Sequence, residues 1–215
     1  MSKTIELCKV RQGEVFTLDG AEFVKLDDDQ GVVFALTRDV ALKNIPFEDG
    51  DADRDDHNNF SGSNLWKVME RWARDKHQAI YDALVERSID LTTMDGMTDY
   101  GCPVVLIRAL TIDEYRKYRK FIPLTSEAYW LATGYSTNSS PSSNASLAYY
   151  VYTVGTLYYD RVYSAYFAAR PALYLKSSIL VSVDDGEEET GITGFTDTEL
   201  MDELYRRRRA TYDQD

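Results

Sequence analysis

Residues that build covalent or metal-bound frameworks are scarce in this sequence. It contains 2 cysteines, Cys8 and Cys102, and 2 histidines among 215 residues. Cysteines so far apart form neither a disulfide framework nor a CxxC metal site. We expect them to be small buried residues or free thiols, and the sequence leaves a single bridge between them open. The scarcity of histidine leaves no HExxH motif and no Ser–His–Asp arrangement, so the chain is not predicted to be an enzyme.

Long apolar runs and a positive net charge are also missing. No run is long enough to span a bilayer, and the N-terminus shows no apolar segment of a Sec signal, so we expect synthesis in the cytoplasm. The net charge of −12 disfavours a nucleic-acid partner, because phosphates require a basic surface. The one basic cluster, Arg206–Arg209, is better explained as a helix face that pairs with neighbouring carboxylates.

Carboxylates are concentrated in residues 44–62, which read NIPFEDGDADRDDHNNFSG. The alternation of Asp49, Asp51 and Asp53 resembles a calcium-binding loop in composition. The spacing differs from that of an EF-hand, and no glutamate closes the loop at its twelfth position. We therefore predict a flexible acidic loop and no cofactor, with a structural calcium ion at Asp49–Asp56 as the alternative.

Short segments in which apolar and polar residues alternate, or which are apolar throughout, predict β-strands. The candidates are Glu14–Leu18, Ala21–Lys25, Gly31–Leu36, Val104–Arg108, Tyr129–Ala132, Leu147–Val154, Leu157–Val162, Pro171–Leu175 and Ile179–Val183. We expect Asp27–Gly31 to form a solvated hairpin turn. The first strands then form an N-terminal β meander.

Helical spacing of apolar residues lies between these strand regions. One helix is expected to begin at Ser63 or Asn64, a second to run from about Lys76 to Ser88, and a third to begin after Thr111. Together these elements predict an α+β domain over residues 1–183. The remaining residues, 184–215, read as an acidic linker followed by a helical tail over Asp197–Arg209.

Tyrosine is crowded between Ala128 and Leu175, where most other residues are small and few are charged. A folding core would use leucine, isoleucine and valine, whereas tyrosine with serine, alanine and glycine is typical of binding surfaces. The alternative is that these tyrosines form the core of a β layer. The pairs Tyr149-Tyr150 and Tyr158-Tyr159 argue against it, because adjacent residues of a strand point to opposite faces.

Short motifs follow one another in a recognisable order. They are Gly13–Phe16 with Glu22–Leu26, Ser63–Val68, Leu110–Tyr115, Tyr129–Thr133 and Ala169–Lys176. In this order they resemble phage and Firmicute proteins with a C-type-lectin-like fold, close to its formylglycine-generating-enzyme-like branch. Many of these are the variable proteins of diversity-generating retroelements. The resemblance covers residues 10–183 and is strongest over 128–176.

The resemblance implies a C-type-lectin-like fold in which a C-terminal antiparallel β region displays a tyrosine-rich surface. It implies a binding protein for a protein or glycan target on a cell surface, with a phage particle as an alternative destination. A non-diversified phage tail, structural or adhesion protein of the same fold is the alternative. The formylglycine-generating branch uses a cysteine pair in the C-terminal part of its fold, and no cysteine follows Cys102 here, which again disfavours an enzyme.

The same resemblance assigns roles to residues. Trp130 is expected in the core, and Arg170, which precedes Pro171, is expected to hold its strand through hydrogen bonds. The side chains expected to contact a ligand, called the displayed residues below, are Tyr149, Tyr150, Tyr152, Val154, Leu157, Tyr158, Tyr159, Arg161, Tyr163, Ala165 and Tyr166.

Residue usage within 147–167 agrees with diversification by a reverse transcriptase that copies adenines with errors. Such copying of AAY codons cannot produce lysine, glutamate, glutamine, methionine or tryptophan. None of these residues occurs between Leu147 and Phe167. Ala168–Lys176 would then be the invariant strand that anchors the surface.

Overall fold

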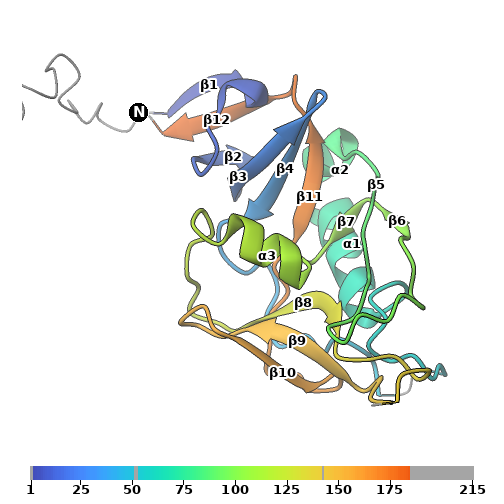
Figure 1. Cartoon of the computed structure of the whole chain (residues 1–215). Helices are drawn as coiled ribbons and strands as arrows, with labels where there is room; N and C mark the ends of the chain where they lie inside the picture. The colour runs from blue at the N-terminus through green and yellow to red at the C-terminus, as the bar shows by residue number, and fades with distance from the viewer. Residues whose placement is uncertain (1, 51–52, 142, 185–215) are drawn as a thin grey trace, which may run out of the picture. The chain divides into compact units, whose positions relative to one another are not determined.

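The computed structural model describes residues 2–50, 53–141 and 143–184 (Figure 1). The contacts separate one unit, Ser2–Val183, from the remainder of the chain. The expected tail helix, Asp197–Arg209, lies outside the described residues, as does Asp51 of the acidic loop. In the described part of the chain, no helix has the length and apolar character needed to cross a membrane.

The largest element is a seven-stranded sheet with the order β1-β12-β2-β3-β4-β11-β7. Its strands are β1 (Ser2–Glu6), β2 (Val15–Leu18), β3 (Ala21–Asp29), β4 (Val32–Thr37), β7 (Ile107–Arg108), β11 (Ala172–Lys176) and β12 (Leu180–Asp184). The predicted meander is confirmed, because β2, β3 and β4 pair antiparallel in sequence order. The strand β1 was not predicted. Its residues SKTIE carry little of the apolar alternation by which a strand is recognised.

Two-residue turns join the strands of the meander, and the second of them is shorter than predicted. Asp19-Gly20 and Gln30-Gly31 both take positive φ angles, with φ of 51° and 76° in the first and 49° and 82° in the second. Two consecutive residues with positive φ are the mark of a tight two-residue hairpin. The prediction that Asp27–Gly31 is a solvated turn was therefore wrong over Asp27–Asp29, which belong to β3. The Tyr118 hydroxyl donates to the Asp27 carboxylate over 2.6 Å and ties it to the third helix.

Three α-helices follow the meander. The first, α1 (Asn64–Lys76), begins where predicted, because the Ser63 hydroxyl accepts the Trp66 amide over 3.2 Å. The second, α2 (Gln78–Ala83), ends five residues before the predicted Ser88, because Leu84 bridges to Leu175 and Val85 donates to the Tyr174 carbonyl. The third, α3 (Ile112–Tyr118), starts at a capping box formed by Thr111 and Glu114. A short 3₁₀ turn, η1 (Leu7–Lys9), follows β1.

A three-stranded antiparallel sheet, β10-β9-β8, lies at the opposite end of this unit from β1 and β12 (Figure 1). It consists of β8 (Tyr129–Gly134), β9 (Leu147–Val151) and β10 (Leu157–Arg161). A pair, β5 (Arg87–Ser88) and β6 (Val104–Val105), forms a third sheet. The single strand predicted over Val104–Arg108 is thus divided between two sheets. These elements confirm the α+β prediction.

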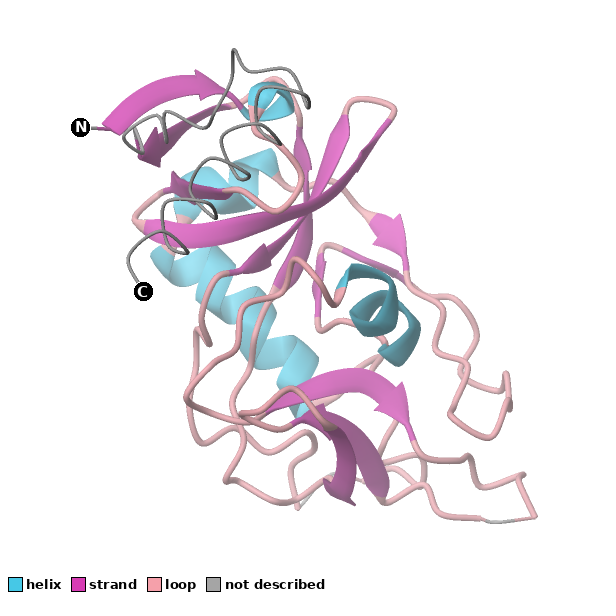
Figure 2. Cartoon of the chain, turned by 60° about the vertical axis from the view of Figure 1, so that its left-hand side comes forward, coloured by secondary structure: helices cyan, strands magenta, loops and turns pink. Residues whose placement is uncertain are grey.

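The core has two parts, and β8 contributes to both. Trp130 and Ala132 belong to the part that includes the buried face of α1, whereas Tyr129 and Leu131 belong to the part beneath α3. This division follows from the alternation of a strand whose residues are all buried. Figure 2 shows α3 between the larger sheet and the three-stranded sheet. Trp130 is 0% exposed, so the prediction that it is a core residue is confirmed.

Both cysteines are free and exposed. The prediction of free thiols is confirmed, and the alternatives of burial and of a bridge between them were wrong. Cys8 lies in η1 and Cys102 lies in the loop before β6, and in neither place is the side chain covered by the core.

Arg170 joins segments that are far apart in the sequence. Its guanidinium is 1% exposed and donates to three carbonyls, those of Thr37 at 3.0 Å, Arg38 at 2.6 Å and Pro123 at 3.1 Å. It also lies 4.9 Å from the ring centroid of Tyr129. Burial lowers the pKa of Arg170, while the neighbouring Tyr129 raises it. Arg170 therefore holds the end of β4, the loop before β8 and β8 itself together, as predicted for a scaffold residue.

We expect Arg170→Met to lower the free energy of unfolding by about 3 kcal/mol or more, because three carbonyls lose their donor and the hydrogen bond to one of them, that of Thr37, is buried. Urea denaturation followed by circular dichroism measures this. Arg161→Met is the matched control, because Arg161 is exposed on β10, and should change stability by less than about 0.5 kcal/mol. Equal losses in the two variants would show that Arg170 does not have this role.

Candidate functional site

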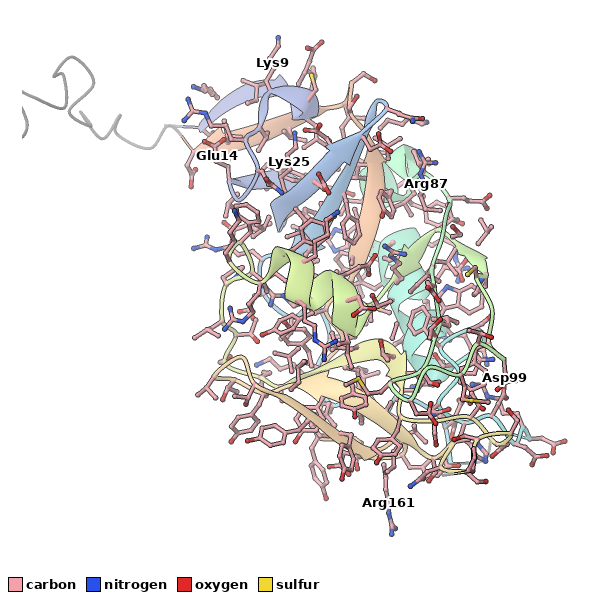
Figure 3. The ribbon with its side chains drawn as sticks, in the orientation of Figure 1. Lys9, Glu14, Lys25, Arg87, Asp99 and Arg161 are labelled. Carbon is pink, nitrogen blue, oxygen red and sulfur yellow. The ribbon has the colours of Figure 1, made fainter. Side chains whose placement is uncertain are left out.

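The displayed residues lie on and around the three-stranded sheet. The hairpin of β9 and β10 carries most of them, and the segment 162–166 that follows β10 carries the rest. Figure 3 shows side chains projecting outward along this end of the unit, with Arg161 pointing away from its body. The outermost strand is β10, which pairs with β9 alone in the described part of the chain.

None of the displayed residues is buried. Tyr149, Tyr150 and Leu157 are half-buried, and the others are exposed. Tyr166 is the most exposed of the displayed tyrosines at 86%, whereas Tyr158 and Tyr159 are each 52% exposed. The intervening residues Ala148, Val151 and Val162 are buried. The segment therefore alternates between side chains that reach solvent and side chains that hold the sheet on the core.

One face of the sheet carries a cluster of three tyrosines. Tyr149 lies directly opposite Tyr159 in the strand register, and both rings contact Tyr135. The ring centroids are 6.1 Å apart for Tyr135 and Tyr149, 4.9 Å for Tyr135 and Tyr159, and 5.8 Å for Tyr149 and Tyr159. Tyr159 meets both other rings edge to face, an arrangement that the charge distribution of aromatic rings favours.

The other face carries Tyr150 and Tyr158, which also lie opposite each other. Tyr150 packs inward against Phe167 and Trp130, with centroid distances of 4.3 Å and 6.0 Å. Tyr158 continues the row outward to Tyr152, whose ring is 6.2 Å away. The alternative that the tyrosines of this region form a core is right for Tyr129 and in part for Tyr149 and Tyr150, which pack against the core. It is wrong for Tyr152 and Tyr158, because this row ends in solvent.

Burial raises the pKa values of Tyr149, Tyr150 and Tyr163. These phenols consequently remain protonated at neutral pH and can donate hydrogen bonds. Near Tyr149, Arg116 lowers the pKa and Asp95 raises it, so charges of both signs border the cluster. Aromatic faces combined with phenol hydroxyls bind a partner through contact area and hydrogen bonds.

The turn that joins β9 to β10 is held from below by α3 and the segment that follows it. The Tyr115 hydroxyl donates to the Gly155 carbonyl over 2.8 Å, and Gly155 has a φ of 82°. A side chain at this glycine would collide with Arg119 and approach Leu124. These contacts fix the direction of the hairpin, which carries Tyr152 and Val154 at its end.

Asn58 anchors the other end of the same sheet. Its side chain is 0% exposed and donates to the carbonyls of Ser136 at 2.9 Å and Leu147 at 2.8 Å. The Tyr100 hydroxyl in turn donates to the Asn58 side-chain oxygen over 2.6 Å. One side chain thus holds both ends of the serine-rich loop 135–146 that leads into β9.

The acidic loop is attached beneath Tyr163. Glu48 is 1% exposed, and its carboxylate forms an ion pair with Arg54 at 2.9 Å. Arg54 also donates to the Ser61 carbonyl at 2.9 Å, and His57 meets the Tyr163 ring edge to face with centroids 5.4 Å apart. Among the described residues, which exclude 51–52, no three His, Cys, Asp or Glu side chains are grouped as metal ligands would be.

Three residues at this surface were missed by sequence reasoning. Tyr135 completes the tyrosine cluster, although it lies in the loop after β8 and shows no strand alternation. Leu124 is 60% exposed and lies beside the turn of the hairpin. His57 contacts Tyr163 from the acidic loop. The composition of the tyrosine-rich region could have included Tyr135, but no local pattern indicates the other two.

Comparison of the chain with protein-family models, curated proteins and solved structures finds no match.

We expect Asn58→Ala to lower the free energy of unfolding by about 2–4 kcal/mol, because the Ser136 carbonyl and the Tyr100 hydroxyl lose their partner and the Leu147 carbonyl keeps only the Tyr135 amide. Thermal and urea denaturation measure the loss. Asn138→Ala is the control, since Asn138 is an exposed residue of the same loop whose side chain reaches the Asp55 carbonyl. If the Asn58 variant is as stable as this control, the loop is held by other contacts.

Proposed function

We propose that the chain is a ligand-binding protein and that the displayed residues form its recognition surface. The observation that carries this is the alternation along 147–167. Exposed or half-buried tyrosines project from a backbone that Ala148, Val151 and Val162 fix to the core. Exposed apolar and aromatic patches on a rigid sheet are typical of interaction sites. The ligand class is a protein or glycan target on a cell surface.

In this proposal the scaffold is C-type-lectin-like and the surface is diversified by a retroelement. The antiparallel sheets and the three helices are compatible with such a scaffold. Residue usage over 147–167, which contains none of the five residues inaccessible to adenine mutagenesis of AAY codons, supports diversification. A phage tail, structural or adhesion protein with an invariant surface is the second candidate, and it is favoured only if the codons of this region do not vary.

Sequencing this gene and its flanking DNA across the source population tests the proposal. We expect substitutions to concentrate at the displayed positions within codons 147–167, next to a near-repeat and a reverse transcriptase gene. Codons for the buried residues Ala148, Val151 and Val162 should stay invariant, because their side chains pack on the core. The codons of α1 are the internal reference for ordinary variation. A variation rate in 147–167 equal to that of α1 would refute diversification and favour the second candidate.

Removal of the outer tyrosines should leave the fold intact. We expect the combined substitution of Tyr152, Tyr158, Tyr159 and Tyr166 by serine to lower the free energy of unfolding by less than about 2 kcal/mol in total, because these side chains are 47–86% exposed. Tyr129→Ser is the matched control, since Tyr129 is a tyrosine of the same sheet that is 3% exposed, and it should cost about 3–5 kcal/mol. A fourfold variant as unstable as this control would mean that the outer tyrosines belong to the core.

A further inference from the structure

A cleft lies apart from the displayed residues, between the segment 88–94 and the beginning of α3. It encloses about 470 Å³. This volume falls within the range of about 300–1,000 Å³ that is usual for small-molecule sites. Met94 and Ile112 contribute apolar surface, and most of the other lining residues are polar. None of the displayed residues lines it.

Three hydroxyl groups that line this cleft accept a hydrogen bond within the described part of the protein but donate none there. The Thr111 oxygen accepts the Glu114 amide at 3.2 Å, and the Thr133 oxygen accepts the Ile112 amide at 3.0 Å. The Tyr174 oxygen accepts a guanidinium N–H of Arg108 at 3.2 Å. Within the described residues, none of these hydroxyls donates to a protein acceptor. Each can therefore donate one hydrogen bond to an oxygen held in the cleft.

Arg108 adds a buried donor to the same wall. Its side chain is 3% exposed and is held by Glu114, the Ser88 carbonyl and the Tyr174 hydroxyl. Its Nε–H is buried without an acceptor in the part of the chain that the structure describes. A buried donor of this kind is normally satisfied by a water molecule or by a bound group.

The cleft also provides acceptors. One carboxylate oxygen of Asp90 accepts the Thr92 amide at 2.9 Å and the Thr92 hydroxyl at 2.6 Å, which leaves the second oxygen available. Hydrogen bonds from Thr92 lower the pKa of Asp90, so this carboxyl is ionised at neutral pH. The other charges pair with one another, Arg108 with Glu114 and Arg116 with Asp113. Asp90 therefore leaves the cleft with a net negative charge, which disfavours anionic ligands.

We propose that this cleft binds a neutral, hydroxyl-rich small molecule of monosaccharide size. Each hydroxyl of such a ligand can accept and donate hydrogen bonds, which matches the free hydroxyl donors and the free carboxylate oxygen that line the cleft. The apolar C–H groups of the ligand can lie against Met94 and Ile112. The site uses residues outside the tyrosine-rich region, so it does not depend on the function proposed above.

Cys102 provides a direct readout, because this exposed thiol lines the cleft and Cys8 is an exposed thiol that does not. The rate of alkylation by iodoacetamide is measured at both cysteines of the full chain by peptide mass spectrometry. The probes are D-glucose, D-galactose, D-mannose and myo-inositol at about 10 mM, because a ligand of this size is expected to bind with a Kd of about 1 mM. At about ten times the Kd, alkylation of Cys102 should slow about tenfold while that of Cys8 is unchanged.

The test variant is Asp90→Asn, which removes the charge from an exposed side chain and leaves the hydroxyls of the cleft in place. We expect it to abolish the protection of Cys102, with an unchanged circular dichroism spectrum and an unchanged Cys8 rate. Asp113→Asn, at an exposed residue whose carboxylate is already paired with Arg116, should retain the protection. Choline at about 10 mM is the cationic probe.

Three outcomes would overturn the proposal. One is the absence of protection by every sugar and by inositol. Another is protection that persists undiminished in Asp90→Asn. The third is protection by choline alone, which would identify a site for organic cations.

Discussion

The larger sheet and the three-stranded sheet depend on the hydrogen bonds that the buried guanidinium of Arg170 donates. It takes the carbonyls at the end of β4 and before β8 as its acceptors and lies over the Tyr129 ring. A guanidinium has donors in a fixed fork, so it can hold several carbonyls in one geometry, which a lysine could not. Burial of such a charge is costly unless its donors are satisfied. The positions of β8 and of the strands beyond it are therefore determined from outside the tyrosine-rich hairpin.

Polar side chains also hold backbone carbonyls of other segments at both ends of the three-stranded sheet. Asn58 satisfies carbonyls at the two ends of loop 135–146, and Tyr115 reaches the turn at Gly155. Each anchor is a polar group that belongs to a different segment from the one it holds. A surface fixed in this way loses little conformational entropy on binding, because its backbone is ordered in advance. The tyrosines add contact area with few rotatable bonds, which keeps the cost of ordering their side chains small.

Local patterns in the sequence were sufficient for the strands of the meander and of the three-stranded sheet, for the exposed tyrosines and for the cap of α1, because each depends on residues close together in the chain. Local patterns were insufficient where contacts between residues far apart in the sequence determine the end of a helix or the partners of a side chain. The early end of α2 follows from a bridge between Leu84 and Leu175, and Asn58 acts on residues 78 and 89 positions away. Arg170 could be predicted as a hydrogen-bonding residue from its place before a proline, but its acceptors could not. The C-type-lectin-like scaffold stays a proposal, since it rests on motif order alone.

Placing the anchors outside the hairpin has a consequence for what the hairpin can tolerate. Within 147–167 the buried side chains include Ala148, Val151 and Val162, which are small or aliphatic and lie between displayed residues, and Phe167, which follows the last displayed residue. The polar contacts that fix the hairpin reach its backbone carbonyls at Leu147 and Gly155, which are present whatever side chain stands at a displayed position. Substitution of a displayed tyrosine therefore changes the surface presented to a ligand without removing an anchor. A scaffold of this kind suits a binding surface whose sequence varies, and it does so because its stability and its specificity depend on different atoms.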